Sequence, residues 1–148
     1  MNREQKEGRG KKEGLKPLYL VLLIVFTVAS FMYINKDHKI TDLKADYGIA
    51  NGKIEKYIVS KGVNKLNTCD FTFITNGEVF YGNNNSNPFT NLPNEKPNLE
   101  LNYLVIYQKS KPINNYILLN YPIKDSTDFK KYRVLFEKGI PKNVFRND

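Results

Sequence analysis

Apolar positions along the chain form one long unbroken run and several short alternating runs. The long run extends from Pro17 to Asn35, PLYLVLLIVFTVASFMYIN, and carries no charged residue. A helix over this stretch is roughly 28 Å long, and a bilayer core is about 30 Å thick. An apolar run of this length is typical of a membrane span rather than of a buried helix in a soluble protein. Thr27 and Ser30 are tolerated there because each can bond back to the preceding turn. The sequence therefore predicts a transmembrane helix over residues 17–35, in contact with the lipid bilayer.

The same run also fits a cleaved signal peptide. Val28-Ala29-Ser30 would serve as a small-residue cleavage site after a positively charged beginning. The apolar run nevertheless continues past Ser30 through Phe31 to Ile34, which favours an uncleaved anchor. Removal of residues 1–30 stays open as the alternative.

Residues 1–16 are charged and dotted with glycine, a composition that predicts a disordered basic tail. This flank of the apolar run is more basic than the other, with Arg3, Lys6, Arg9, Lys11, Lys12 and Lys16 against Lys36, Lys39 and Lys44. The more basic flank of a membrane helix stays in the cytoplasm. We therefore expect a single-pass protein of the cytoplasmic (inner) membrane with its N-terminus inside and its C-terminal domain outside the cytoplasm.

After the apolar run, residues 36–48 are polar and show little periodicity, which predicts a juxtamembrane linker that can begin with a helical turn continuing the anchor. Gly48 and the pair Asn51-Gly52 indicate turns. Residues 49–148 then form the predicted extracytoplasmic domain. Its first strand, Lys53 to Ser60, is rich in β-branched and aromatic residues, and its imperfect alternation indicates a bulge or an edge position.

The clearest local signal is the stretch Thr68 to Gly82, TCDFTFITNGEVFYG. Asn76-Gly77 fits a two-residue type I′ turn. This turn places Thr75 opposite Glu78, Ile74 opposite Val79 and Phe73 opposite Phe80. One face of the hairpin then carries Phe71, Phe73 and Phe80, and the other carries Thr72, Ile74, Val79 and Tyr81. We expect the aromatic face to lie in the core.

A loop and two further strands follow the hairpin. Glu100 to Gln108 alternates with apolar residues on both faces, which indicates a central strand. Pro112 to Asn115 indicates a turn, and Tyr116 to Asn120 a returning strand that Pro122 ends. Between the hairpin and the strand at Glu100, the stretch Asn83 to Asn98 is long, polar and proline-rich, which predicts a loop. We expect Phe89 and Leu92 of this loop to pack onto the sheet.

Residues Asp125 to Lys138 change to a helical period. Asp125 or Ser126 can cap the helix, and Gly139 is a natural residue to follow its end. The residues Phe129, Tyr132, Leu135 and Phe136 fall on one arc of the helix, which we expect to be buried. Val144 and Phe145 are expected to pack back on the sheet.

The charge and the reactive residues limit the classes of partner and site that the sequence predicts. The net charge is +8, but most of the basic residues are lysines spread singly along a chain rich in Asn, Ile, Tyr and Phe, so nucleic acid is not expected as a partner. The single cysteine, Cys69, excludes a disulfide within one chain. The only histidine, His38, lies far from Cys69 in sequence, so no base is paired with the thiol. We predict no catalytic, cofactor-binding or metal-binding residues and no cofactor.

Several of these positions also form a recognisable arrangement: Phe71, Phe73, Gly77, Phe80, Tyr81, Gly82, Tyr103, Val105, Tyr107 and Pro112. It resembles small uncharacterised bacterial membrane proteins, of the domain-of-unknown-function type, in which a transmembrane helix accompanies a small β domain outside the membrane. The resemblance covers about Thr68 to Leu119 and implies an architecture without a known activity. The insert at residues 83–98 and the C-terminal helix depart from it.

These observations predict an α+β domain after the membrane helix. The domain has about five antiparallel strands, in a sheet or partial barrel, and one C-terminal amphipathic helix. The favoured function is a non-enzymatic envelope protein that binds a protein partner or supports a complex. One alternative is an enzyme or small-ligand binder with a site between the 83–98 loop and the sheet, using Tyr81, Tyr103 or Glu100. A second alternative is an immunity-type protein, secreted or anchored.

Overall fold

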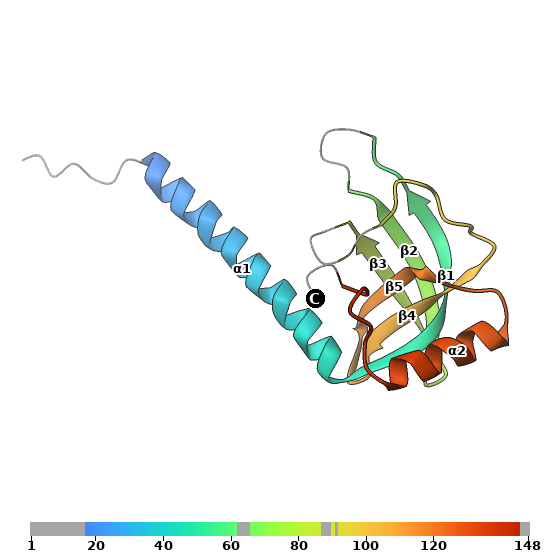
Figure 1. Cartoon of the computed structure of the whole chain (residues 1–148). Coiled ribbons are helices and arrows are strands. Elements are labelled where there is room, and N and C mark those ends of the chain that lie inside the picture. The colour runs from blue at the N-terminus through green and yellow to red at the C-terminus, as the bar shows by residue number, and fades with distance from the viewer. Residues whose placement is uncertain (1–16, 62–65, 87–89, 91, 146–148) are drawn as a thin grey trace, which may run out of the picture. The chain divides into compact units, whose positions relative to one another are not determined.

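The computed structural model describes residues 17–61, 66–86, 90 and 92–145, apart from the side chains of residues 17, 18 and 33–37. Its elements are α1 (Pro17–Ala45), β1 (Tyr47–Ile58), β2 (Thr68–Thr75), β3 (Glu78–Asn85), β4 (Asn102–Gln108), β5 (Lys111–Ile123) and α2 (Ser126–Glu137) (Figure 1). The chain divides into two compact units, Met1–His38 and Lys39–Asp148. The predicted tail at residues 1–16 and Phe89 lie outside the described residues.

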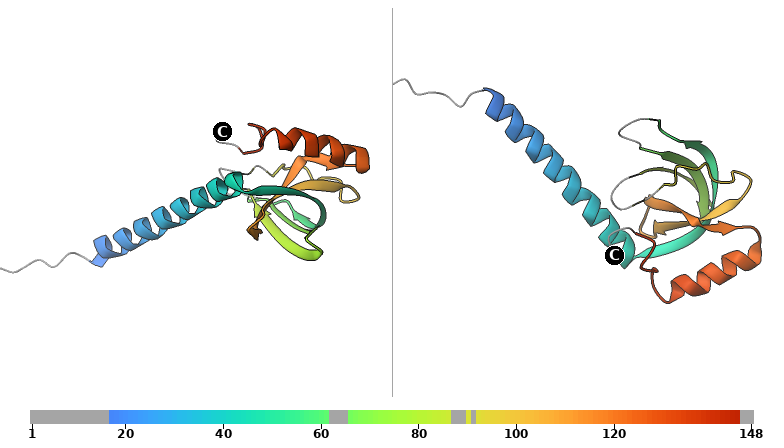
Figure 2. Two further views of the ribbon diagram at one scale, coloured as in Figure 1. Left: turned by 90° about the horizontal axis from the view of Figure 1, so that it is seen from below. Right: turned by 45° about the horizontal axis from the view of Figure 1, so that its top comes forward.

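The second unit contains one antiparallel sheet with the strand order β3-β2-β1-β4-β5. The helix α2 follows the last strand and lies outside the curved sheet (Figures 1 and 2). The α+β class, the five antiparallel strands and the C-terminal helix are therefore confirmed.

The central strand β1 belongs to two ladders along different halves of its length. It pairs with β4 over Tyr47–Lys53 and with β2 over Gly52–Ile58. A register shift between Ile54 and Lys56 in the pairing with β2 provides the predicted bulge. The alternative of an edge position is wrong, because β1 is the central strand. The turns predicted at Gly48 and at Asn51-Gly52 are also wrong, because β1 begins at Tyr47 rather than at Lys53 and contains these residues.

The hairpin of β2 and β3 has the predicted register, with Thr75 opposite Glu78 and Phe73 opposite Phe80. Asn76 and Gly77 both have positive φ angles, 52° and 78°. Positive φ at both central positions is what a type I′ turn requires, and Asn and Gly tolerate it best. Local turn chemistry therefore fixes which face of the hairpin is buried.

The two outer strands of the sheet, β3 and β5, are joined through the side chain of Asn84. Its Nδ2 donates to the carbonyl of Asn115 at 3.3 Å, and its Oδ1 accepts from the backbone N–H of Ile117 at 2.7 Å. Asn84 is buried, so these bonds are shielded from water. The prediction of a loop from Asn83 is corrected here, because β3 continues to Asn85.

The curved sheet encloses an inner core of aromatic side chains. The Phe73 ring lies 5.6 Å from that of Phe80 and 5.5 Å from that of Tyr107, measured between centroids. Phe71 is buried in the same cluster, and Phe80 is partly buried against it. The aromatic side of the hairpin is therefore part of the core, as predicted. Side chains from the inner face of β1, β4 and β5 pack against it.

A second core lies on the outer face of β4 and β5, under α2. The helix contributes buried Phe136 and partly buried Phe129 and Tyr132, whereas Leu135 is exposed, against the prediction. Asp125 caps the helix by accepting from the N–H groups of Thr127 at 2.7 Å and Asp128 at 3.1 Å. The capped helix and its three packed aromatic residues confirm the predicted start and most of the predicted face.

Both ends of this second unit add to the outer core. Phe145 is buried and meets the Tyr116 ring edge-on, with centroids 5.7 Å apart, as expected for a tail that packs back. Ile40 and Leu43, from the last turns of α1, are buried in the same cluster. The prediction of a linker at residues 36–48 is corrected here, because the helix continues to Ala45 and its end packs on the sheet.

The strand β5 differs from the prediction at both ends, and it continues through Pro122 to Ile123 instead of ending at Pro122. The turn after β4 falls at Lys109 and Ser110, and β5 starts at Lys111, so Pro112 to Asn115 form strand rather than turn. Pro112 and Pro122 are tolerated because β5 is an outer strand, where a missing N–H need not interrupt a ladder.

The helix α1 contains the charge-free stretch of residues 17–35. Large apolar side chains are exposed along it, including Leu23, Phe26 and Phe31. Thr27 Oγ1 bonds back to the carbonyl of Leu23 at 2.7 Å, as expected for a hydroxyl in an apolar helix. Among the residues that the structure describes, no helix is long and apolar enough to cross a membrane. The membrane span over residues 17–35 stays a prediction.

The Asn84 bridge between β3 and β5 can be tested by unfolding. Asn84→Ala leaves the buried N–H of Ile117 and the carbonyl of Asn115 without their partner, so we expect a loss of about 1–3 kcal/mol in unfolding free energy. Urea unfolding of the full chain in detergent, followed by circular dichroism, measures this loss. The control is Asn83→Ala, because Asn83 is exposed and its side chain bonds to the Asp70 carboxylate. Equal losses in the two variants would contradict a closing role for Asn84.

Candidate functional site

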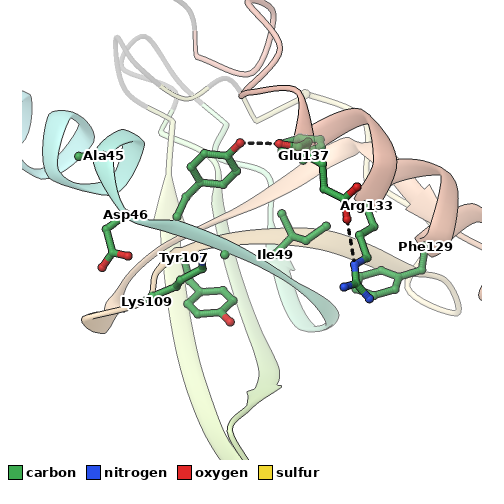
Figure 3. A pocket seen from close by; sticks show the side chains of 11 residues that line it. Ala45, Asp46, Ile49, Tyr107, Lys109, Phe129, Arg133 and Glu137 are labelled. Atoms are coloured by element: carbon green, nitrogen blue, oxygen red, sulfur yellow. Dashed lines mark hydrogen bonds and ion pairs between the residues drawn. The ribbon is translucent and has the colours of Figure 1, made fainter.

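A cleft of about 580 Å³ lies beside the first half of β1, and we call it the β1 cleft (Figure 3). Its floor comes from the end of α1 and the start of β1, and one wall comes from α2. The lining residues are Ala45, Asp46, Tyr47, Gly48, Ile49, Tyr107, Lys109, Phe129, Arg133, Phe136 and Glu137. All of them belong to the compact unit Lys39–Asp148. The cleft thus joins residues that lie far apart in sequence.

The floor of the β1 cleft contains an unpaired strand edge. Lys109 N donates to the carbonyl of Asp46 at 2.8 Å, so the backbone polar groups of Asp46 point toward the side of β4. Backbone groups alternate in direction along an antiparallel strand, so Gly48 also faces β4 while Tyr47 and Ile49 face the opposite side. The pairing of β1 with β2 begins only at Gly52. Within the described part of the chain, no backbone group pairs with Tyr47 or Ile49 on that side.

Tyr107 closes the inner side of the cleft. Its ring lies against Gly48, where an added Cβ would come within 2.7 Å of the ring carbon Cζ. Its hydroxyl is 2.7 Å from the Thr75 hydroxyl at the tip of the hairpin. Glycine at position 48 therefore lets the Tyr107 ring pack directly on the strand backbone.

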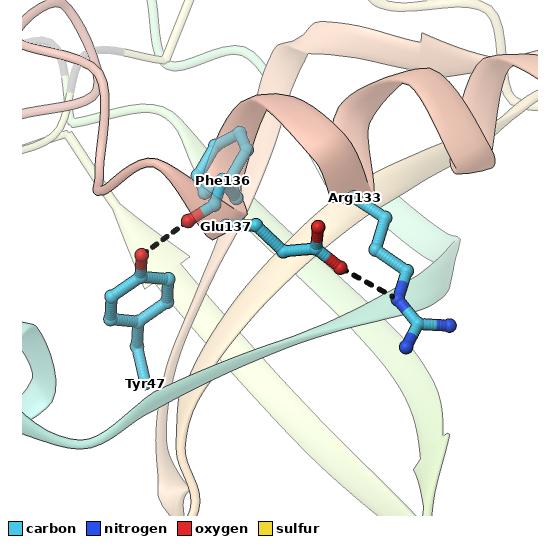
Figure 4. Close-up of polar contacts among 4 residues, drawn as sticks. All are labelled: Tyr47, Arg133, Phe136 and Glu137. Atoms are coloured by element: carbon cyan, nitrogen blue, oxygen red, sulfur yellow. Dashed lines mark hydrogen bonds and ion pairs between the residues drawn. The ribbon is translucent and has the colours of Figure 1, made fainter.

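A polar contact joins the helix α2 to β1 beside the cleft. The Tyr47 hydroxyl donates to the carbonyl of Phe136, near the end of the helix (Figure 4). Arg133 Nε lies 3.4 Å from Glu137 Oε1 on the same helix. Because both of these side chains are exposed, their ion pair contributes little stability and can be exchanged for a partner's charges. Tyr47 is therefore the main polar link between the floor and the wall.

The acidic residue on the floor stays ionised. Asp46 Oδ2 accepts from the Ser110 N–H at 2.8 Å, and hydrogen bonds from Ser110 lower the pKa of Asp46. A general acid at neutral pH needs a raised pKa instead. Glu137 is paired with Arg133. Asp46 thus lacks the raised pKa of a general acid, and its carboxylate is already hydrogen-bonded within the chain.

A second exposed feature is the outer surface of the β2–β3 hairpin. Three large apolar side chains lie on it, with 64% of Ile74, 54% of Val79 and 72% of Tyr81 exposed. We call these three residues the hairpin face. A shallow depression beside it is bordered by the acidic residues Glu55 and Asp70. The face is thus apolar with an acidic margin.

The structure does not bring together the residues of the alternative ligand site. Tyr81 points outward on the hairpin face, whereas Tyr103 is buried in the inner core and donates its hydroxyl to the carbonyl of Asn98 at 3.1 Å. Glu100 is exposed on the loop. With Tyr81 and Tyr103 on opposite faces of the sheet, these residues cannot line one pocket.

The described part of the 83–98 loop is held against the sheet. Asn67 Nδ2 bonds to the carbonyls of Leu92 at 3.1 Å and Pro93 at 2.8 Å. Tyr57 donates its hydroxyl to the carbonyl of Pro93 at 2.5 Å. Leu92 is buried in the inner core, as expected. The loop therefore closes one end of the curved sheet.

The remaining reactive residues are not among those that line the β1 cleft. Cys69 is buried in the inner core, and burial raises the pKa of its thiol to about 12. His38 is exposed on α1. In the part of the chain that the structure describes, no three side chains of His, Cys, Asp or Glu gather into a metal site.

The buried state of Cys69 predicts slow reaction with thiol reagents. With its pKa near 12 the thiol is protonated at pH 8, and thiolate is the reactive form. We expect the folded chain to resist labelling by a maleimide at pH 8 and to react fully in urea. Mass spectrometry reads a single site because the chain has one cysteine. Rapid labelling of the folded protein would show that Cys69 is accessible.

Comparison of the chain with protein-family models, curated proteins and solved structures finds no match in any of the three. The resemblance to small bacterial membrane proteins stays a prediction. The function is therefore argued from the β1 cleft, the hairpin face and the apolar segment themselves.

Proposed function

We propose that the protein is a membrane-anchored, non-enzymatic binding module that presents its β domain to a protein partner outside the cytoplasm. The helix over residues 17–35 serves as the anchor, and Lys39–Asp148 serves as the binding domain. The hairpin face carries the proposal, because its apolar residues are exposed on a rigid two-stranded scaffold.

The anchor is supported by the sequence of residues 17–35. The stretch is free of charge, and the stretch before it is the more basic flank. The described apolar side chains of this segment, at residues 19–32, are mostly exposed. Exposed apolar surface is unfavourable in water at about 25 cal/mol per Å². Transfer to lipid relieves this cost, so an anchored state accounts for the composition of α1.

The hairpin face supports a protein as the partner. Single exposed apolar side chains are common on protein surfaces, but a contiguous patch on an ordered element is typical of a binding surface. Glu55 and Asp70 border the face, and neither is joined to a cation in the part of the chain that is described. A partner with an apolar contact and a neighbouring basic side chain fits both features.

A binding role also agrees with the chemistry of the second unit. The carboxylate on the floor of the β1 cleft has a lowered pKa, and the thiol is buried. The small-ligand alternative loses support because Tyr81 and Tyr103 lie on opposite faces of the sheet. No described residue specifically favours the immunity-type alternative.

Anchoring and orientation can be tested in intact spheroplasts. The full chain with a C-terminal epitope should stay in the membrane fraction at its full mass, and external protease should digest the epitope. A cytoplasmic marker protein controls for leakage. A protected epitope would place the domain in the cytoplasm, and a soluble product short by the first 30 residues would indicate a cleaved signal peptide.

The hairpin face can be tested by a charge substitution. Tyr81→Asp places a charge on the face, so crosslinking to the partner in native membranes should fall by about tenfold, because burying an unpaired charge is costly. The matched control is Ile113→Asp, since Ile113 lies on β5 and is 68% exposed. Crosslinked adducts are compared by mass spectrometry at equal expression. An unchanged pattern for Tyr81→Asp, or an equal loss for Ile113→Asp, would count against the hairpin face.

A further inference from the structure

We infer that the open edge of β1 in the β1 cleft accepts an extended segment of a protein partner as an added strand. The inference rests on the proposed binding function and names the form in which a partner is bound. It concerns a surface other than the hairpin face, so the two can be tested separately.

The first argument is the unpaired backbone at Tyr47 and Ile49. Each of them directs one N–H and one C=O toward the cleft, away from β4, as the bond from Lys109 N to the carbonyl of Asp46 establishes. Residues two apart on a strand lie about 6.8 Å apart. Another extended polypeptide has donors and acceptors at the same spacing, and strand addition of this kind is a common mode of peptide recognition.

The second argument comes from the other half of the same strand. Beyond Lys53, β1 no longer pairs with β4. In the same way, it does not pair with β2 before Gly52. The protein's own loop contacts that second half, because the Tyr57 hydroxyl bonds to the Pro93 carbonyl and Leu92 is buried in the same inner core as Tyr57. One half of β1 is thus contacted by the protein's own chain. Over the first half, the described residues form a cleft of about 580 Å³ instead.

The third argument is the shape and chemistry of the cleft walls. Side chains of an added strand would alternate between the two faces of the sheet. Those on the outer face would meet Ile49 and Phe129, and those on the inner face would meet Tyr107 (Figure 3). Lys109 lies at one end of the cleft with an exposed side chain. The expected segment therefore has bulky apolar residues at alternate positions and an acidic residue near Lys109.

The edge also lacks the features that usually protect exposed strands. Natural proteins block such edges with proline, lysine or a bulge. The bulge of β1 lies between Ile54 and Lys56, beyond the open part, and residues 47–51 read Tyr-Gly-Ile-Ala-Asn. The wall formed by α2 leaves the edge within a cleft rather than on an open surface. This arrangement favours one added strand over indefinite sheet extension.

The test uses the full chain in detergent micelles and a displayed library of random decapeptides. The library is selected on the unmodified protein, and enriched peptides are measured by fluorescence anisotropy against two variants. Ile49→Pro removes the N–H at the open edge and fills its place with the proline ring. Ile49→Ala truncates the side chain similarly but keeps the N–H. We expect enriched peptides to bind Ile49→Pro at least about tenfold more weakly than Ile49→Ala.

A second measurement keeps the test independent of how well Ile49→Pro folds. Amide hydrogen exchange of the unmodified protein should slow at Tyr47 and Ile49 when an enriched peptide is added. The inference is overturned if enriched peptides bind both variants equally, if they leave these two amides unprotected, or if no peptide is enriched. Topology and Tyr81-dependent crosslinking would still report on the proposed function in each of these cases.

Discussion

The structure depends on one strand that changes partners. β1 pairs with β4 along its first half and with β2 along its second, and the two ladders overlap only at Gly52 and Lys53. A strand that pairs in this way lies where the sheet bends, and the bulge after Ile54 increases the local twist. This bend brings the outer strands β3 and β5 close enough for Asn84 to join them. The sheet itself then encloses the aromatic side chains Phe71, Phe73 and Phe80 on its inner face. The helix α2 covers the outer face of the sheet instead.

The elements that the sequence predicted well are those whose cause is local. Asn76-Gly77 fixes the hairpin register through its own backbone angles, and Asp125 caps α2 through its own side chain. The first part of β1 could not be predicted, because asparagine and glycine at positions 51 and 52 indicate a turn when read locally. In the folded chain Gly52 lies where two ladders meet, and no short-range pattern reports pairing with strands that come later in the sequence.

Long-range contacts explain the remaining differences. Asn84 lies in an asparagine-rich run that predicts a loop, and its burial depends on β5, more than thirty residues away along the chain. Ile40 and Leu43 did carry a signal, since apolar residues three apart share a helix face, but polar neighbours obscured it. The β1 cleft had no sequence signal, because its floor and its α2 wall become neighbours only after the sheet has curved. The hairpin face, in contrast, follows directly from the alternation of β2 and β3.

The size of the open edge is compatible with the proposed membrane anchor. Two residues with outward backbone groups offer up to four hydrogen bonds, each with a net contribution of about 0.5–1.5 kcal/mol. Part of this gain offsets the ordering of the bound segment, so the edge alone supports modest affinity. Confining both partners to one membrane raises their effective concentration, and a second contact at the hairpin face would act in the same way. Modest affinity at each surface then gives stable association in the membrane while leaving each contact reversible. A soluble form of the same domain would need a much larger interface to achieve this, and the proposed anchor therefore complements the small binding surfaces of the domain.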